Sequence, residues 1–459
     1  MRSTLRLAVL VLVVCGLLAP GTAGAQALSG QNPIERVDVI TEAQPTGWRV
    51  VAVAIEYRNR VNLGNAEIPN SAYQVAATIN GMTANRTVVD VYTTTAPELD
   101  RRGRRGSPGR YVIVELDPAD RNAGALTFSG GINNPIPLVG AYTVRQTANI
   151  RNAQDDVALR ATPFAVANQG VINPIVDDFL PLSYTDSAGT TLGFRLYQPD
   201  VPANRRRTGV PLVVHLHGAG ERGANNITQI TANQGAVAFA TPERQASDPS
   251  YVLAPQAPAG QAWTTPAVQA ALLELIDRVV ATHPIDEDRL YLSGISLGAI
   301  GSFDLLPKHP DLFAGALLVA GTGDVTQMAG MRDVPLWANH SIDDAVVNYN
   351  TGSLALVNAI GAAGVPVTIG QWAGNLPDRA AEAEALRLWN QADESGSHTL
   401  LTAYTPGTTP VNAHWSWVPA YQNDVMIDWL YSQDLQDREE SPSALVSAAG
   451  RASLALSGR

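Results

Sequence analysis

The chain is short of cysteine and of positive charge. Its 459 residues include one cysteine, Cys15, and its 31 Lys and Arg against 42 Asp and Glu give a formal net charge of −11. A lone cysteine excludes an intrachain disulfide, so the fold cannot depend on a disulfide framework. Because phosphate binding needs clustered positive charge, the acidic balance argues against nucleic acid as a partner.

Long apolar segments are missing too. The run from Leu7 to Ala19 is shorter than the roughly 20 residues that a membrane-spanning helix needs, and no later segment is long enough. This run follows Arg2 and Arg6 and precedes the small-residue pattern Ala25-Gln26-Ala27, as in a secretory signal peptide. We therefore expect residues 1–27 to be a cleaved signal peptide, with no stable membrane span and a secreted or periplasmic location. The alternative is an uncleaved signal that anchors the chain.

Histidine is absent before His215, and the N-terminal part shows no catalytic pattern. Between residues 28 and 170, short runs rich in Val, Thr, Ile and Tyr alternate apolar and polar positions and are separated by turn residues. This pattern predicts a small all-β sandwich over residues 28–170. The clearest runs are Trp48 to Tyr57, Ala72 to Ile79, Thr87 to Thr94, Tyr111 to Leu116 and Tyr142 to Ile150.

The sequence pattern changes over residues 171–433. Apolar, strand-like runs alternate with stretches of helical spacing, which predicts a mostly parallel sheet covered by helices on both faces. Residues 434–459 are small and polar, and we expect a disordered tail there. The strand-like runs are Pro211 to Leu216, Tyr251 to Ala254, Arg289 to Leu292, Gly315 to Val319, Val334 to Trp337 and Val365 to Ile369, and the helix-like stretches are Pro266 to Thr282 and Tyr349 to Ala363.

A Gly-x-Ser-x-Gly pattern, Gly294-Ile-Ser296-Leu-Gly298, lies between a strand-like run and the helix-like stretch Leu297 to Leu306. A strand–turn–helix elbow of this kind holds its serine in a strained conformation with the hydroxyl exposed, and glycines are needed where neighbouring backbone passes too close for a Cβ. We predict Ser296 to be a nucleophile. The alternative is an ordinary strand-to-helix turn.

A second glycine-rich loop, His217-Gly-Ala-Gly-Glu-Arg-Gly223, follows an earlier strand-like run. Acyl transfer needs backbone N–H groups aimed at the carbonyl oxygen as it becomes an oxyanion. In the elbow architecture one donor follows the nucleophile, here Leu297, and the other comes from such a loop, here Ala219. The alternative is a plain glycine turn, and neither Glu221 nor Arg222 is assigned a catalytic role.

A hydroxyl nucleophile needs a base, and the base needs an acid that fixes its tautomer. Asp344, in a loop after a strand-like run, is the favoured acid, with its neighbour Asp343 as the alternative. If the chain order is serine, acid, histidine, only His398 and His414 can be the base. His398 begins a strand-like run, whereas His414 follows a loop rich in Pro, Gly and Thr, so His414 is favoured.

Five motifs in this order resemble one family. Over residues 185–432 the chain is similar to the bacterial α/β-hydrolase esterases often labelled predicted peptidases, which are related to polyhydroxyalkanoate depolymerase and feruloyl esterase domains. Some members carry an immunoglobulin-like domain before the hydrolase. The motifs are the loop His217 to Gly223, the run Ala254-Pro255-Gln256 followed by Trp263, the elbow Gly294 to Gly298, the stretch His340 to Val347 and the segment His414-Trp-Ser-Trp417.

The resemblance implies an α/β-hydrolase fold behind an immunoglobulin-like domain. The helix-like run Asp378 to Gln391 is a departure that either covers the site or, as we favour, packs on the outside of the sheet. The residue roles that the resemblance implies are Ser296 as nucleophile, Asp344 as acid, His414 as base, Ala219 and Leu297 as oxyanion donors and Trp263 as a wall of the acyl or alcohol site.

The resulting hypothesis is a secreted serine carboxylesterase that works through an acyl-enzyme and needs no metal or organic cofactor. No cluster of His and acidic residues has the spacing of a metal site. The expected partner is an ester, either a small molecule or a polymer, and the β domain is a candidate surface for a homo-oligomer. The alternatives are a serine peptidase with the same triad, a polyester depolymerase, and a cell-surface binding protein whose hydrolase domain is inert.

Overall fold

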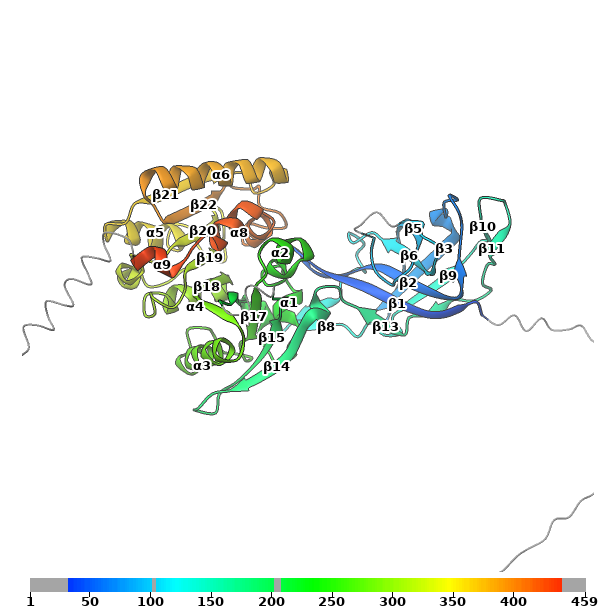
Figure 1. The fold of residues 1–459 in the computed structure, drawn as a ribbon, viewed down its shortest axis with the longest axis horizontal. Coiled ribbons are helices and arrows are strands. Elements are labelled where there is room, and N and C mark those ends of the chain that lie inside the picture. The colour runs from blue at the N-terminus through cyan, green and yellow to red at the C-terminus, as the bar shows by residue number, and fades with distance from the viewer. Residues whose placement is uncertain (1–31, 101–104, 202–207, 440–459) are drawn as a thin grey trace, which may run out of the picture.

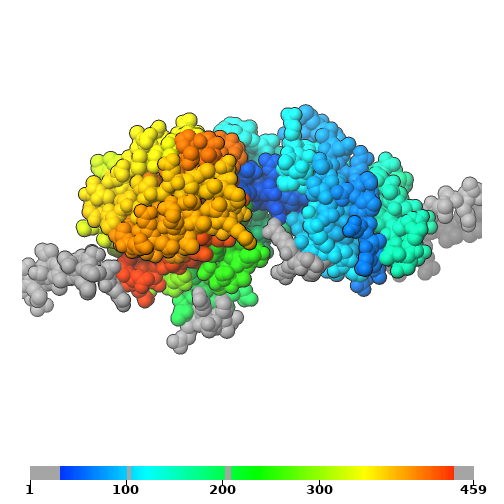
Figure 2. All heavy atoms as spheres, turned by 90° about the horizontal axis from the view of Figure 1, so that it is seen from above, coloured from blue at the N-terminus to red at the C-terminus, as the bar shows by residue number. Residues whose placement is uncertain are grey.

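The chain folds into two lobes, one all-β and one α/β (Figure 1). The computed structural model describes residues 32–100, 105–201 and 208–439, and the predicted signal peptide lies outside them. Seen from above, the lobes lie side by side, with blue residues of the first strands between them (Figure 2). The predicted fold class, a β-sandwich followed by a mostly parallel sheet with helices, is confirmed.

Two sheets face each other in the β lobe. Alternate residues of both sheets point into one apolar core, where Val53 and Ile55 of the first sheet meet Val144 of the second. The first sheet has the order β13 (Gly170–Ile172), β1 (Ile34–Gln44), β2 (Gly47–Val61), β6 (Gly109–Leu116) and β5 (Val88–Thr94). The second has the order β12 (Val166–Ala167), β9 (Tyr142–Gln146), β3 (Tyr73–Ile79) and β4 (Met82–Arg86).

Two small two-stranded sheets accompany the sandwich. One pairs β10 (Ile150–Arg151) with β11 (Val157–Leu159), and the other pairs β7 (Leu126–Ser129) with β8 (Ile132–Pro135). The β7–β8 hairpin turns through Gly130 and Gly131, whose φ values of 62° and 81° suit the tight turn that Gly-Gly favours. Strand β8 lies against the α/β lobe, next to η3 (Ala219–Glu221) and α1 (Thr228–Thr231).

The α/β lobe is built on a nine-stranded sheet. Strands β14 and β15 form an antiparallel edge, β15 is also antiparallel to β17, and the remaining neighbours are parallel. The strand order is β14 (Phe179–Thr185), β15 (Thr191–Tyr197), β17 (Tyr251–Gln256), β16 (Val210–Leu216), β18 (Ile285–Ile295), β19 (Gly315–Val319), β20 (Leu336–Ser341), β22 (Thr399–Tyr404) and β21 (Val367–Trp372).

Both faces of this sheet are buried under helices. Strand β16 is apolar apart from His215, because Leu212 and Val214 join the core on one face while Val213 joins the core on the other. One face is covered by α3 (Pro266–Thr282), α4 (Leu297–Leu305) and α5 (Ser353–Ala362). The other is covered by α1, α6 (Asp378–Ser395), α7 (Trp417–Tyr421) and α8 (Asp424–Tyr431), beside the short α2 (Pro242–Ser247).

Helix α6 contains the helix-like run predicted at Asp378 to Gln391. It packs on the outside of the sheet. Its buried residues Ala385, Leu388 and Ala392 belong to the core of the second face, against β21 and β22. Among the described residues, α6 included, no helix is long and apolar enough to cross a bilayer.

The predicted tail is wrong over its first residues. Residues 435–439 form α9 (Leu435–Glu439), and the Arg438 guanidinium donates to the backbone oxygens of Pro310, at 2.9 Å, and Ala314. These bonds satisfy carbonyl groups in the segment that precedes β19, so this end of the chain is fixed beside the sheet. Residues 440–459 lie outside the described part of the chain.

The lobes meet at the end of β1 as well as at the β7–β8 hairpin. Strand β13 pairs with β1, and the chain enters the second lobe through η2 (Val176–Asp178). Ile227, next to α1, packs against the apolar cores of both lobes, and Ala43 of β1 packs against the second. The contact between the lobes therefore has an apolar part that does not involve the hairpin.

Candidate active site

Ser296 occupies the sharp turn between β18 and α4. Its φ of 49° and ψ of −115° are a strained combination for a residue with a side chain, and the side chain is half-buried. A Cβ on Gly298 would lie 1.9 Å from the backbone oxygen of Leu216, and one on Gly294 would lie 2.9 Å from the backbone of Gly298. The elbow therefore needs glycine at both positions, as the sequence predicts.

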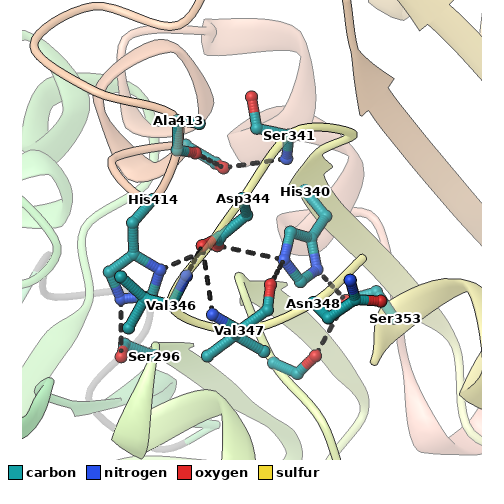
Figure 3. Close-up of polar contacts among 12 residues, drawn as sticks. Ser296, His340, Ser341, Asp344, Val346, Val347, Asn348, Ser353, Ala413 and His414 are labelled. Carbon is teal, nitrogen blue, oxygen red and sulfur yellow. Dashed lines mark hydrogen bonds and ion pairs between the residues drawn. The ribbon is translucent and has the colours of Figure 1, made fainter. Parts of the chain in front are cut away.

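His414 lies between Ser296 and Asp344 (Figure 3). Its Nε2 is 3.0 Å from the Ser296 Oγ, and its Nδ1 is 2.7 Å from an Asp344 carboxylate oxygen. In the neutral tautomer that this geometry favours, Nδ1–H donates to Asp344 and the serine hydroxyl donates to Nε2. The loops after β20 and β22 bring these groups together over the end of β18.

The structure separates the favoured residues from their alternatives. Asp343 is exposed and accepts the backbone N–H of Gly407 at 2.8 Å, away from the histidine. His398 instead donates to the backbone oxygen of Arg332 at 2.8 Å. Of the two adjacent aspartates, only Asp344 reaches His414.

Four donors surround the fully buried carboxylate of Asp344. One oxygen accepts the backbone N–H groups of Val346 at 2.8 Å and Val347 at 3.0 Å, and the other accepts His414 and His340, the latter at 3.1 Å. Burial alone would raise the pKa of Asp344, but the hydrogen bonds that it accepts from His340, His414 and the backbone hold this pKa below its usual range. The carboxylate is therefore ionised and fixed in orientation.

His340 is a buried second histidine that the sequence arguments left without a role. Its Nε2 also lies 2.9 Å from the backbone oxygen of Val347, and its Nδ1 lies 2.8 Å from the Ser353 Oγ. A carbonyl and a carboxylate on one nitrogen require a proton there, and the other nitrogen is paired with the Ser353 hydroxyl, which also lies 3.3 Å from the backbone oxygen of Gly321. The sequence does hint at this contact, because His340 and Asp344 lie four residues apart in the stretch His340 to Val347.

The glycine-rich loop lies against the nucleophile. A Cβ on Gly218 would lie 3.6 Å from the Cβ of Ser296, and Ala219 follows directly as the first residue of η3. Leu297 is the first residue of α4. Among the described residues, no other hydrogen bond engages the backbone N–H of Ala219 or of Leu297. Both groups are therefore available to an oxyanion at Ser296, assisted by the positive end of the α4 dipole.

Buried aromatic groups support this loop from behind. His217 donates from Nδ1 to the oxygen of Gly218 at 2.6 Å and accepts the N–H of Ala257 on Nε2 at 3.0 Å. Burial lowers the pKa of His217 to about 4, so its ring stays neutral. Trp263 is only 1% exposed and donates its indole N–H to the His217 oxygen at 3.0 Å. The expectation that Trp263 lines the substrate site is therefore corrected, since it lies beneath the loop.

Glu221, at the end of η3, is a buried carboxyl group. Burial raises its pKa to about 7, against the opposing hydrogen bonds from Asn133 and from the backbone amides of Glu221 and Gly218. Among residues 32–100, 105–201 and 208–439, no group of three or more His, Cys, Asp or Glu is arranged to hold a metal ion. The groups at the site are those of acyl transfer: a hydroxyl, an imidazole, a carboxylate and two backbone donors.

Comparison with known proteins finds two families along the chain. The family described as "Esterase Ig-like N-terminal domain" matches residues 36–158, and the family described as "Putative esterase" matches residues 187–405. Poly(3-hydroxyalkanoate) depolymerase C of Paucimonas lemoignei is 29% identical over 157 residues, which cover 30% of this chain and 34% of the depolymerase. The match therefore spans about a third of that relative's length.

A solved structure resembles the whole two-lobed arrangement. The crystal structure of a thermostable esterase has a TM-score of 0.74 and 29% sequence identity, and the match covers 87% of this chain and 100% of that chain. Because the match takes in all of that chain and most of this one, both lobes have counterparts there.

Substitution of the two adjacent aspartates distinguishes their roles. We expect Asp344→Asn to lower kcat for ester hydrolysis by about 10⁴-fold, because the histidine loses the acceptor that fixes its tautomer. Asp343→Asn, the matched control, should stay within about twofold of the wild type, because Asp343 points away from His414. Steady-state kinetics with p-nitrophenyl butyrate measure both, and equal losses in the two variants would contradict the assignment.

His340→Phe tests whether the second histidine positions the acid. Loss of a hydrogen bond to a buried carboxylate is worth about 1.5–3 kcal/mol, so we expect kcat to fall by roughly 10- to 100-fold while KM changes little. Ser353→Ala is the control, because it leaves the Nε2 bond to Asp344 in place. A His340→Phe enzyme with wild-type kcat would show that Val346, Val347 and His414 suffice to hold the carboxylate.

The raised pKa of Glu221 makes stability depend on pH in a definite direction. Between pH 4.5 and about 7 the unfolded chain loses this proton first, so the folded state binds more protons and stability falls as pH rises. Glu221→Gln cannot ionise. As pH rises through this range, the unfolding free energy of the variant should therefore increase relative to that of the wild type by about 3 kcal/mol. Urea unfolding at pH 4.5, 6 and 8 measures the difference, and a difference that is constant with pH would contradict the assignment.

Proposed function

We propose that this chain is a carboxylic ester hydrolase and that Ser296, His414 and Asp344 are its catalytic triad. The activity is supported by the matches to an esterase Ig-like N-terminal domain and to an esterase family, and by the likeness to the structure of a thermostable esterase. The observation that carries the proposal is the pair of distances on His414, 3.0 Å to the serine and 2.7 Å to the carboxylate. The esterase match ends at residue 405, so the assignment of His414 depends on this geometry and on its motif.

In the proposed reaction His414 removes the proton of Ser296 as the hydroxyl oxygen attacks the ester carbonyl carbon. The carbonyl electron pair moves onto oxygen, which accepts hydrogen bonds from the amides of Ala219 and Leu297. His414 then gives its proton to the departing alcohol as the bond from carbon to alkoxy oxygen breaks, which leaves an acyl-enzyme. Water repeats the sequence and releases the carboxylic acid.

The surroundings of the triad favour an apolar substrate. Val346, which follows the acid, is 71% exposed, and Val411, three residues before the base, is 62% exposed. Exposed apolar side chains this close in the chain to the acid and the base favour the binding of an apolar acyl or alcohol group. A second candidate is polyester hydrolysis, which is favoured by the sequence match to a poly(3-hydroxyalkanoate) depolymerase. Export through residues 1–27 remains a prediction from the sequence.

The decisive variant is Ser296→Ala. We expect kcat with p-nitrophenyl acetate and butyrate to fall by about 10⁴-fold or more, and labelling by a fluorophosphonate probe to disappear, because no other nucleophile replaces the hydroxyl. Ser247→Ala, which changes an exposed serine of α2, is the control and should behave as the wild type.

Matched substrates separate the alternatives. The butyryl ester, the butyryl anilide and a film of poly(3-hydroxybutyrate) are given to the same wild-type preparation. Faster turnover of the anilide would replace the esterase proposal by a peptidase, and release of hydroxy acid from the film would extend the proposal to polyesters. Equal ester hydrolysis by the wild type and Ser296→Ala would reject the triad.

A further inference from the structure

We propose that the β7–β8 hairpin of the N-terminal domain positions the oxyanion loop, residues 217–223, of the esterase domain. Asn133 of the hairpin is the positioning residue and Glu221 is its partner in the loop. The inference rests on the proposed function, because it assigns the hairpin a role in holding the donor that Ala219 supplies.

The hairpin touches the loop directly. The Asn133 side-chain amide donates to a Glu221 carboxyl oxygen at 3.2 Å. A Cβ on Gly220 would lie 3.0 Å from the same amide nitrogen and 3.6 Å from the ring of Phe128, the other hairpin residue at this contact. The residue next to the proposed oxyanion donor is therefore in contact with the neighbouring domain, where Figure 1 shows β8 beside α1.

Glu221 also contacts the part of the loop that lies next to Ser296. A Cβ on Gly218 would lie 3.0 Å from the second Glu221 carboxyl oxygen and 3.6 Å from the Cβ of Ser296. The backbone oxygen of Glu221 accepts Gln256 at 2.8 Å and Thr228 at 3.2 Å, which fixes the end of η3 to β17 and α1. The carboxyl group thus lies between Asn133 on one side and Gly218 on the other, and Ala219 is the residue that follows Gly218 in the chain.

Loss of the Asn133 bond is expected to act locally. The lobes are also joined by apolar packing, in which Ile227 contacts both cores and Ala43 contacts the second. Without its side-chain donor the buried carboxyl group keeps only the backbone amides of Glu221 and Gly218 as donors, so it is less firmly held and the loop that it supports can shift. A small displacement of an oxyanion donor is costly because the hydrogen bond depends steeply on distance and angle.

The contact also explains why a carboxyl group can remain buried at the loop. The titratable or charged neighbours of Glu221 are His217, whose Nδ1 is 4.0 Å away, and Arg222, and the hairpin contributes the neutral amide of Asn133. His217 already uses Nδ1 to bind the oxygen of Gly218. The Asn133 amide is thus the side-chain donor that the structure gives to this carboxyl group.

A double-mutant cycle in the full-length chain tests the proposal. With p-nitrophenyl butyrate, Asn133→Ala should lower kcat by about 10-fold with KM within about twofold, because the loop acts on the transition state. Asn133→Asp, of the same shape but with an acceptor in place of the donor, should lower kcat further. In a Glu221→Ala background, Asn133→Ala should have no additional effect, because its partner is gone.

Asn134→Ala is the matched control. The Asn134 amide donates within the hairpin, to Ser129 and to the backbone of Ile132, so this variant disturbs the hairpin without touching Glu221. Its kcat should remain within about twofold of the wild type. A general weakening of the interface would lower kcat in Asn134→Ala as much as in Asn133→Ala, and that result would overturn the proposal.

The outcomes separate this inference from the triad. If Ser296→Ala is inactive and Asn133→Ala has wild-type kcat, the triad stands and the hairpin has no positioning role. If Asn133→Ala loses the same factor in the wild-type and Glu221→Ala backgrounds, Asn133 does not act through Glu221 and the inference is also wrong. If Ser296→Ala keeps wild-type activity, the proposed function itself fails, whatever the hairpin variants do.

Discussion

The buried carboxylate of Asp344 is the group on which the geometry of the site depends. It lies on the loop after β20, and its two oxygens accept two backbone N–H groups and two histidine rings. A buried anion is unfavourable unless it is hydrogen-bonded, and four donors meet that requirement without a neighbouring Lys or Arg. Because those donors fix both oxygens in space, the imidazole of His414 has one orientation available to it, with Nε2 toward Ser296.

The sheet makes this convergence possible. Strands β16, β18, β20 and β22 run parallel, so their carboxyl ends lie along one edge, and the loops that follow them carry Ala219, Ser296, Asp344 and His414. Residues more than a hundred positions apart in the chain therefore come within hydrogen-bonding distance of one another. A hydrogen bond from the Ser341 N–H at the end of β20 to the Ser416 Oγ, at 3.0 Å, joins the acid loop to the base loop.

Local patterns in the sequence were enough to predict the parts of the site that depend on local geometry. The elbow at Ser296 follows from a strand, two glycines and a helix, and the choice of His414 followed from chain order and loop composition. The preference for Asp344 over its neighbour Asp343 has weaker support in the sequence, because only the fold shows which carboxyl group turns inward. The prediction that Trp263 lines the substrate site is wrong for a related reason. The motif gives the position of Trp263 along the chain, but its burial depends on what the rest of the chain packs over it. The helix at residues 435–439 was missed because bonds to distant carbonyl groups, rather than an apolar stripe, fix it to the sheet.

The contacts that support the oxyanion loop can be predicted from the sequence only in part. Its inner support comes from its own domain, through His217, which lies in the glycine motif itself, and Trp263, which belongs to the next motif along the chain. Its outer support comes from Asn133, 88 residues earlier in another domain, and no local period or spacing relates the two. A glycine-rich loop can approach a substrate closely because it lacks side chains, but for the same reason it has few internal contacts to hold it. The loop must then take its rigidity from neighbouring elements. In this chain one of those elements belongs to the β domain, so that domain is physically continuous with the proposed catalytic centre.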